Sequence, residues 1–470
     1  MRSLLAFAIS SLAVLQSAAA RADEAPPRAD DTAASSAAPA QQQTAPLPPL
    51  DERISELEAQ NLLNHFHLGG YFVFRFDDIT YRPNNDPSKD NHVAPISLRF
   101  ALNVDADISD DLKFYSTLGM AKFGNAAFTA NGALAANQLT ADLFGSYTRT
   151  TSALFVDRAY LDYHLRSLPL VLSVGRLPSI EGPPANLWDG EPRSGTYPLM
   201  CFNTIMDGIA LTVILDKLLP EGHILSLRGV WSPLGQLDVA RPYAQVSSGG
   251  TLYDTMPPNG SLMLEWGMKP RTFADSVDLI LEYESTGNVR ISPSILVPDS
   301  PVPLAGDLGS RMQDITAHLE LGDIGHLGLD LAASYTESIT DLSGTMVVAG
   351  TDIPVAVGTG KTYGGGALVS LRYRLPIPQL NRPYVGAEYY YATKNFALFT
   401  TANEDLTNFY MNPGRAFHLY YTQPITQGLT LRVGFRRQNL IAASPNIAVA
   451  GLVETQDRFI TWYANLRLDL

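Results

Sequence analysis

The sequence predicts an all-β fold: a transmembrane, antiparallel, up-and-down β-barrel of about sixteen strands, with roughly fourteen to eighteen compatible with the pattern. Three observations predict it. After residue 65, apolar and polar residues alternate in segments of roughly ten positions. The connections between these segments are short and long in turn. Beyond the N-terminal segment, no uninterrupted apolar run reaches the roughly 18 residues that a membrane-spanning helix requires.

The first twenty residues have the pattern of a signal peptide. Arg2 supplies a positive start, Leu4 to Leu15 form a short apolar core, and residues 17–20 (SAAA) offer a small-residue cleavage site. The alternative is a transmembrane anchor, but the apolar core is shorter than a bilayer-spanning helix. We therefore expect residues 1–20 to direct export and to be removed.

Two further segments precede the barrel. Residues 21–50 are rich in Pro, Ala and Gln and carry little to bury, which predicts a disordered linker. Residues 51–64 predict a short helix, in which Ile54 and Leu57 have heptad-like spacing while Asn61 takes the next such position. This segment is either a coiled-coil stub that supports trimer formation or one to two solvated helical turns. Residues 65–470 are then the barrel.

The last segment shows the alternation best. Ile460, Trp462 and Ala464 share one face, while Thr461 and Tyr463 lie on the other. Each strand thus has an apolar and a polar face. The segments that carry such a pattern are 68–77, 94–106, 111–123, 155–166, 170–177, 207–215, 223–231, 261–268, 277–286, 312–321, 326–337, 363–374, 383–392, 415–423, 429–437 and 456–470.

The connections give an independent argument. With the N-terminus in the periplasm, short turns such as 107–110, 167–169 and 322–325 all fall on the periplasmic side. Short periplasmic turns and long extracellular loops are typical of outer-membrane barrels. A soluble sandwich or propeller has no physical reason to segregate loop length in this way. The predicted long connections are 78–93, 124–154, 178–206, 232–260, 287–311, 338–362, 393–414 and 438–455.

The apolar and polar faces of each strand meet different surroundings in a membrane. All backbone polar groups must be paired inside hydrocarbon, so the sheet has to close, with its apolar face toward lipid. An arginine on the lipid face near mid-bilayer costs about 2–4 kcal/mol, so the charged face must line the lumen. Sixteen strands enclose more space than side chains fill, which predicts a hydrated interior. Trp188, Trp231, Trp266 and Trp462 suit the aromatic girdles at the membrane interfaces.

Composition excludes several other classes. The net charge of −14 argues against nucleic acid as a partner. Cys201 is the single cysteine, so an intrachain disulfide is excluded and a cysteine-based zinc site is not predicted. The sequence contains no HExxH, GxSxG or phosphate-binding motif, and we predict neither enzyme activity nor a cofactor. A hydrolase inside the barrel that uses His164 or His418 is the remaining enzymatic alternative.

The third long connection is the most distinctive stretch. Its prolines and glycines fix one backbone path, and it carries Glu181, Asp189, Glu191 and Arg193. Folded into the lumen, this loop would form a charged constriction that selects ions. One alternative is an ordered extracellular or intermonomer latch. Another is a divalent cation site built from Asp189, Glu191 and backbone carbonyls.

The layout resembles the general porins of Gram-negative bacteria, in which the third loop forms an acidic constriction opposite a basic wall. The loop sequence (GRLPS, GPPANLWDG and GTYP) also resembles an uncharacterised family of porin-like exported barrels. The resemblance implies that Glu181, Asp189 and Glu191 form the acidic side of the pore. It also implies that the basic, pore-lining wall consists of Arg99, Arg372, Arg432 and Arg467.

The same resemblance implies location and partners. We expect a protein of the outer membrane that is inserted by the barrel-assembly machinery, contacts outer-membrane lipid and forms a homotrimer. Porins usually end in an aromatic residue that this machinery reads, whereas Leu470 ends this chain. The expected function is passive diffusion of ions and small polar solutes. The alternative is a structural or surface-interaction barrel whose lumen is plugged.

Overall fold

The structure is a computed structural model. It describes residues 65–123, 155–190, 193, 195–203, 206–234, 259–270, 272–291, 304–348, 354–400, 410, 413–443, 453–454 and 456–470. The signal peptide, the linker and the short helix predicted for residues 1–64 lie outside the described residues. So does Glu191 of the third connection.

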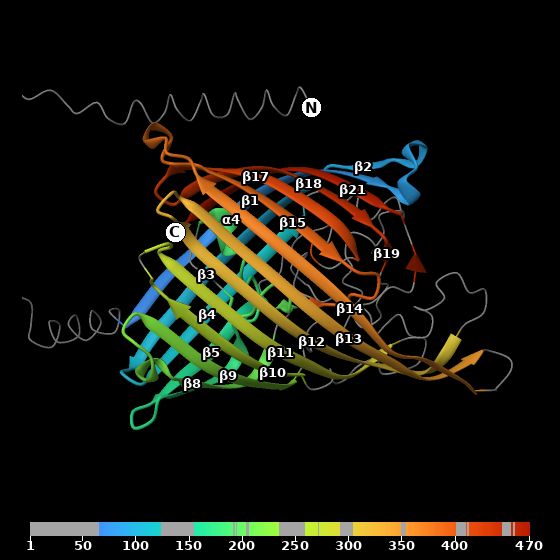
Figure 1. The fold of residues 1–470 in the computed structure, drawn as a ribbon, viewed down its shortest axis with the longest axis horizontal. Helices are drawn as coiled ribbons and strands as arrows, with labels where there is room; N and C mark the ends of the chain where they lie inside the picture. The colour runs from blue at the N-terminus through green and yellow to red at the C-terminus, as the bar shows by residue number, and fades with distance from the viewer. Residues whose placement is uncertain are drawn as a thin grey trace, which may run out of the picture. The chain divides into compact units, whose positions relative to one another are not determined.

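Within the described residues, sixteen antiparallel strands form one closed barrel (Figure 1). Each strand pairs with its neighbours in sequence, and β1 closes the ring by pairing with both β3 and β21. The predicted fold class is therefore confirmed. In chain order the strands are β1 (Phe66–Arg82), β3 (Ile96–Ser109), β4 (Leu112–Phe123), β5 (Phe155–Leu165), β6 (Leu170–Leu177), β8 (Met206–Ile214), β9 (His223–Leu234), β10 (Asn259–Met268), β11 (Ser276–Ile291), β12 (Leu304–Ile324), β13 (Leu329–Val348), β14 (Pro354–Arg374), β15 (Tyr384–Ala392), β17 (Gly414–Thr426), β18 (Leu429–Leu440) and β21 (Arg458–Asp469).

Short and long connections alternate as predicted, with one exception. The sequence predicts long connections at 287–311 and 338–362, but β11 to β14 continue through most of these residues. Only residues 349–353 separate β13 from β14, so the prediction of a long loop there is wrong. The reason is the composition of 338–362, which keeps enough Thr, Val and Ser to continue the ladder as a hairpin.

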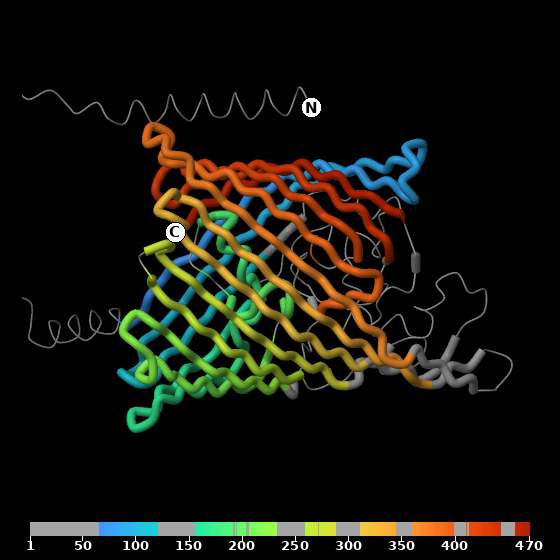
Figure 2. The backbone as a smooth tube through the Cα atoms, in the orientation of Figure 1, coloured from blue at the N-terminus to red at the C-terminus, as the bar shows by residue number. Residues whose placement is uncertain are grey.

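The backbone tube in Figure 2 shows the strands side by side in one tilted wall. Because successive side chains point to opposite faces of each strand, the barrel wall has two different surfaces. In β17, Phe417 and Leu419 are 40% and 44% exposed on the outer face, whereas Ala416 and His418 are buried on the inner face. In β21, Trp462 points outward and its two sequence neighbours are buried. The apolar side faces out, as the sequence predicts, because the polar side chains find partners only inside.

Smaller elements lie in the connections. Between β1 and β3 are η1 (Pro83–Asn85), η2 (Pro87–Lys89) and β2 (Asn91–Val93), and β2 pairs with β1. Two short 3₁₀ turns, η4 (Asp216–Leu218) and η6 (Pro378–Leu380), lie between strands on the short-turn side. The third connection holds α4 (Asn186–Asp189) and β7 (Phe202–Asn203), which pairs with β16 (Phe399–Thr400). A further pair consists of β19 (Ala442–Ala443) and β20 (Val453–Glu454).

None of the helices in the described residues is long and apolar enough to cross a membrane. Two clusters of buried apolar side chains lie within the described residues. One consists of Ile79, Tyr81 and Phe459, near the outer ends of β1 and β21. The other joins the third connection to β14, β15 and β17, and it belongs to the candidate site described next.

Candidate functional site

The third connection, residues 178–205, follows one tightly fixed path. A Cβ atom at Gly182 would lie 1.6 Å from the carbonyl oxygen of Tyr197, and one at Gly195 would lie 2.1 Å from that of Ile180. Only glycine allows the two legs of this loop to touch so closely. Gly190 ends α4 in the left-handed conformation, with φ 77°. The rigid path that the sequence predicts is therefore imposed by backbone contact.

This connection reaches strands on many sides of the barrel. Arg372 Nη1 of β14 donates to the carbonyl oxygen of Leu187 at 3.0 Å, and Thr422 Oγ1 of β17 donates to that of Trp188 at 2.8 Å. On another side, Arg228 Nη1 of β9 donates to Thr196 Oγ1 at 3.3 Å. Because all these partners point inward from distant strands, the connection lies inside the barrel. The structure does not support the latch.

Three of the four predicted loop charges lie in the described part, and each has an ionic partner on the wall. Glu181 pairs with Arg99 of β3, and Arg193 pairs with Glu265 of β10. Asp189 lies 3.0 Å from Arg432 Nη1 of β18 and 3.7 Å from Arg467 Nη1 of β21. The loop is thus fastened to the wall at three separate places.

All four arginines predicted to line the pore meet this loop. Arg99, Arg432 and Arg467 reach it through carboxylates, and Arg372 reaches it through a backbone carbonyl. Each is also held from elsewhere in the barrel: for instance, Arg372 Nε donates to Asp330 at 2.7 Å. The sequence therefore placed the right arginines near the loop. Their pairing with acids, however, shows that they also act as its anchors.

A buried polar network behind α4 was not predicted. Trp188 Nε1 donates to Glu388 Oε1 at 2.7 Å, and Tyr410 OH donates to Glu388 Oε2 at 2.6 Å. His418 bridges Glu388 and Tyr463, at 2.6 and 2.8 Å from its two ring nitrogens. The tryptophan interacts with the lumenal wall, so its assignment to an interfacial girdle is wrong. The imidazole of His418 is also completely buried, so it is not exposed to the lumen.

Part of this network could have been predicted from the alternation of apolar and polar residues alone. Glu388 and His418 fall on the polar face of their strands, and the two residues pair directly across β15 and β17. Adjacent inward positions on paired strands are candidates for contact. The partners from the connections, Trp188 and Tyr410, have no such periodic signal.

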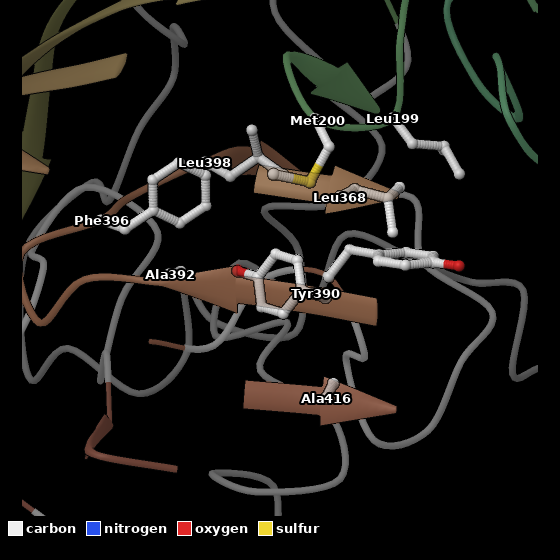
Figure 3. Packing of buried hydrophobic residues seen from close by; sticks show 9 residues of the cluster. Leu199, Met200, Leu368, Tyr390, Ala392, Phe396, Leu398 and Ala416 are labelled. Atoms are coloured by element: carbon white, nitrogen blue, oxygen red, sulfur yellow. The ribbon is translucent and has the colours of Figure 1, made fainter. Parts of the chain in front are cut away.

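An apolar cluster completes the attachment of the loop (Figure 3). Met200 and Leu199 pack with Phe396 and Leu398, which follow β15, and with Leu368 and Tyr390 on the wall; the buried members are Leu199, Met200, Leu368, Tyr390, Ala392, Phe396, Leu398, Tyr410 and Ala416. Inward glycines on β14 make the space: a Cβ at Gly366 would lie 2.7 Å from the ring of Phe396. The glycine run 364–366 thus provides room for packing.

The adjacent Cys201 is completely buried. Burial, together with the nearby carboxylates of Glu282, Glu284 and Asp314, raises the pKa of its thiol well above the ordinary value. A protonated, enclosed thiol is a poor nucleophile and a poor metal ligand. This cysteine therefore serves in packing.

Inward arginines are confined to one arc of the wall, whereas inward acids lie on both arcs. Acidic side chains line β10 to β13, where no arginine or lysine points inward among the side chains that the structure describes. These acids are Glu265, Asp278, Glu282, Glu284, Asp314, Glu320 and Asp330. Among the described side chains, inward arginines lie on the remaining arc of the barrel, at positions 372, 374, 432, 436, 467, 75, 99, 158 and 228, and this arc also carries the inward acids Asp77, Asp105, Asp162 and Glu388. The polar faces read from the sequence contain most of these residues, but the confinement of the arginines to one arc was not predicted.

Metal binding finds little support at the predicted place. The carboxylate of Asp189 faces two arginines, and Glu191 lies outside the described residues. A different group, Asp275, Asp323 and His326, brings ligand atoms within 4.8 Å of one another on the short turns. The contact from His326 Nδ1 to Asp275 at 3.2 Å is an ordinary exposed ion pair, and we assign it no metal.

Comparison with known proteins agrees with this architecture. A model of an uncharacterised family, described as a protein of unknown function (DUF3373), matches residues 89–224. No curated protein matches the sequence. Among solved structures, OprB of Pseudomonas putida has a TM-score of 0.51 and 11% identity, covering 89% of this chain and 97% of its own. OmpF of Salmonella typhi has a TM-score of 0.47 and 11% identity, covering 86% of this chain and 97% of its own.

The likeness to OprB concerns the fold. It confirms the predicted resemblance to outer-membrane porins, which the closed sixteen-strand barrel of the described residues supports independently. The matched family residues, 89–224, include most of the third connection. The sequence resemblance to an uncharacterised porin-like family was based on that loop.

Proposed function

We propose that the chain is an outer-membrane channel through which ions and small polar solutes diffuse passively. The observation that carries this proposal is the third connection, which crosses a charged lumen and is fastened to opposite walls through Glu181, Asp189 and Arg193. A loop held in this way narrows the barrel at a fixed place. The charges around it then act on whatever passes.

The proposed mechanism is electrostatic. Acids on β10 to β13 and arginines on the other arc create a field across the lumen, and low-dielectric walls focus such a field. Arg75 and Arg467 keep 16% and 21% of their side chains exposed, so some positive charge remains available beside the ion pairs. Dipolar solutes would align in this field. Glu181, Asp189, Glu191 and Arg193 are the proposed constriction residues.

Location and assembly belong to the same proposal. The exposed apolar outer face matches lipid, and strand alternation of this kind is typical of outer-membrane barrels. Export by a cleaved signal peptide, insertion by the barrel-assembly machinery and a homotrimer complete it. Crosslinking of the intact chain in membranes measures the oligomeric state directly.

Single-channel recording in a planar bilayer tests the channel. The full mature chain should produce stable conductance steps, and a salt gradient should give a reversal potential that reports ion preference. Folding is checked by the mobility shift of unheated protein on a gel. A folded barrel that inserts without conducting would overturn the proposal.

One observation favours the alternative of a plugged structural barrel. The apolar cluster around Met200 and Phe396 fills part of the lumen on the side of β14, β15 and β17. The comparison to make is between the intact chain and a variant in which residues 183–199 are replaced by a short Gly-Ser linker. If only the variant conducts, the loop is a plug. If both conduct, with a larger step in the variant, the loop is a constriction.

A further inference from the structure

The outer face of the barrel carries an unbalanced group of arginines at one place on its rim. Arg415 of β17, Arg437 of β18, Arg458 of β21 and Arg82 of β1 all occupy outward positions in their strands. These four strands are neighbours in the barrel. We call these four residues the rim arginines.

The register places three of them in one row. Arg415 pairs with Asn439, Asn439 pairs with Arg458, and Arg458 pairs with Arg82. Arg437 lies one outward position deeper, opposite Phe417 on one side and Ile460 on the other. Directly opposed like charges destabilise a sheet. An arrangement of this kind calls for a counter-charge.

The described residues supply only part of that counter-charge. Asp90 binds Arg82 through two hydrogen bonds, of 2.7 and 2.8 Å. Arg458 Nε donates to the neutral amide of Asn439 at 2.9 Å, and its guanidinium lies in the field of both Arg437 and Arg82. Within the part of the chain that the structure describes, neither Arg415 nor Arg437 forms an ion pair, and both are exposed.

A second rim row shows what a balanced arrangement looks like. On the same end of the barrel, outward Arg311 of β12 pairs with Asp341 of β13, which in turn pairs with Lys361 of β14. Outward Glu337 lies four residues, or two outward positions, before Asp341 in the same strand. Positive and negative side chains alternate there and neutralise one another. In the described strands that carry the rim arginines, the outward acid is Asp78 of β1, four residues before Arg82, and its carboxylate lies 3.2 Å from His92 Nε2.

The position of the rim arginines along the barrel wall indicates which anion pairs with them. The rim arginines lie at the strand ends that precede or follow the long connections, which is the extracellular side of such barrels. Below them the outer face turns largely apolar: Leu419, Phe435 and Trp462 form one paired row, which continues to Asp78 of β1. Charges directly above a lipid-facing apolar surface meet the headgroups of the outer leaflet.

We propose that the rim arginines bind the phosphate groups of a lipid in the outer leaflet. Guanidinium groups bind phosphate oxygens through paired, charge-assisted hydrogen bonds, and several arginines in one row match a headgroup with more than one phosphate. The acyl chains of the same lipid lie against the apolar rows beneath. This inference depends on the proposed outer-membrane location and not on conduction.

The test measures lipid retained by the folded full chain. Native mass spectrometry of the detergent-solubilised barrel counts bound molecules of diphosphorylated lipid A, of the same lipid without phosphates, and of inorganic phosphate. Wild-type protein is expected to retain the phosphorylated lipid alone, and the variant R415S/R437S to bind it about tenfold more weakly. The matched control R311S/K361S removes two outward cations from the balanced row and should retain lipid as the wild type does.

Several results would overturn the inference. One is equal retention by R415S/R437S and wild type, and another is equal retention of phosphate-free lipid. Loss of retention in the control variant as well would show a general effect of surface charge. If inorganic phosphate bound as tightly as the lipid, the lipid would not be needed as the source of the bound phosphate. Should the double variant fail to fold, R437Q alone keeps a similar side-chain length and is expected to show a smaller loss.

Conductance separates this inference from the channel proposal. A silent barrel that retains phosphorylated lipid contradicts only the channel. A conducting barrel that retains none contradicts only the lipid site. Since the rim arginines point away from the lumen, R415S/R437S should conduct like the wild type.

Discussion

Two connections of similar predicted length behave in opposite ways. The described residues of 178–203 leave the sheet and fold into the lumen, whereas 338–348 and 354–362 remain in the sheet and lengthen β13 and β14. The first contains closely spaced prolines, glycines that permit backbone contact and side chains that find partners on the wall. The second is a run of small and β-branched residues whose backbone continues to pair. Residue type, more than length, decides where a connection goes.

The largest effect should come from the backbone contact within the third connection. Replacing Gly195 by alanine puts a Cβ 2.1 Å from the carbonyl oxygen of Ile180, so one leg of the loop must move. Overpacking of this kind costs about 1–3 kcal/mol. We expect faster proteolysis of the loop and an altered conductance step. Gly229→Ala is the control because nothing lies within 4 Å of its Cβ position, and an identical effect of the two variants would contradict this account.

Breaking the polar anchor should have the next largest effect. Glu388→Ala leaves the indole N–H of Trp188 and the hydroxyl of Tyr410 without their acceptor, and each buried group left unpaired costs about 1–3 kcal/mol. The temperature at which the folded band disappears on unheated gels should fall. Glu337→Ala, on the exposed outer face, should leave it unchanged. An unaltered transition in Glu388→Ala would show that this network does not stabilise the loop.

A smaller effect is expected from Asp189→Asn. Removing this carboxylate leaves Arg432 and Arg467 without their counter-charge from the loop. The lumen becomes more positive, and the ratio of anion to cation permeability should rise about twofold. Reversal potentials in a salt gradient measure the ratio. Asp341→Asn carries the same charge change on the outer face and should have no effect; a shift toward cations in Asp189→Asn would refute the interpretation.

The smallest effect is expected from shortening the hairpin. Joining Gly344 to Val357 through an Asn-Gly turn keeps their register and removes only residues 345–356. Because these residues lie beyond the charged row of Arg311 and Lys361, we expect conductance and thermal transition to stay as in the wild type. A changed conductance would mean that the hairpin also acts on the lumen.

The particular residues show why prediction worked where it did. The sixteen strand segments were placed correctly because a lipid-facing side and a lumenal side impose a period of two on every strand. Even β8 (Met206–Ile214), whose alternation is weak, keeps Ile209 and Leu211 outward and Ala210 inward. The inward positions of Arg99, Arg372, Arg432 and Arg467 followed from the same period.

The contacts of the third connection could not be predicted in this way. Trp188 meets Glu388 across 200 residues of sequence, and Met200 packs on Phe396 from another connection. Neither connection has a period that relates it to the strands it touches. The role of glycines 364 and 366 likewise depends on Phe396, a residue of another segment that occupies their space.

The sequence by itself determined the closed barrel, its two faces and the side of the long loops, because all three depend on local alternation and on the cost of unpaired polar groups in lipid. Only the tertiary structure decided where the third connection lies, which charges are paired and which arc of the wall carries the inward arginines. These depend on which distant strands close the ring beside one another, and no local pattern of residues contains that information.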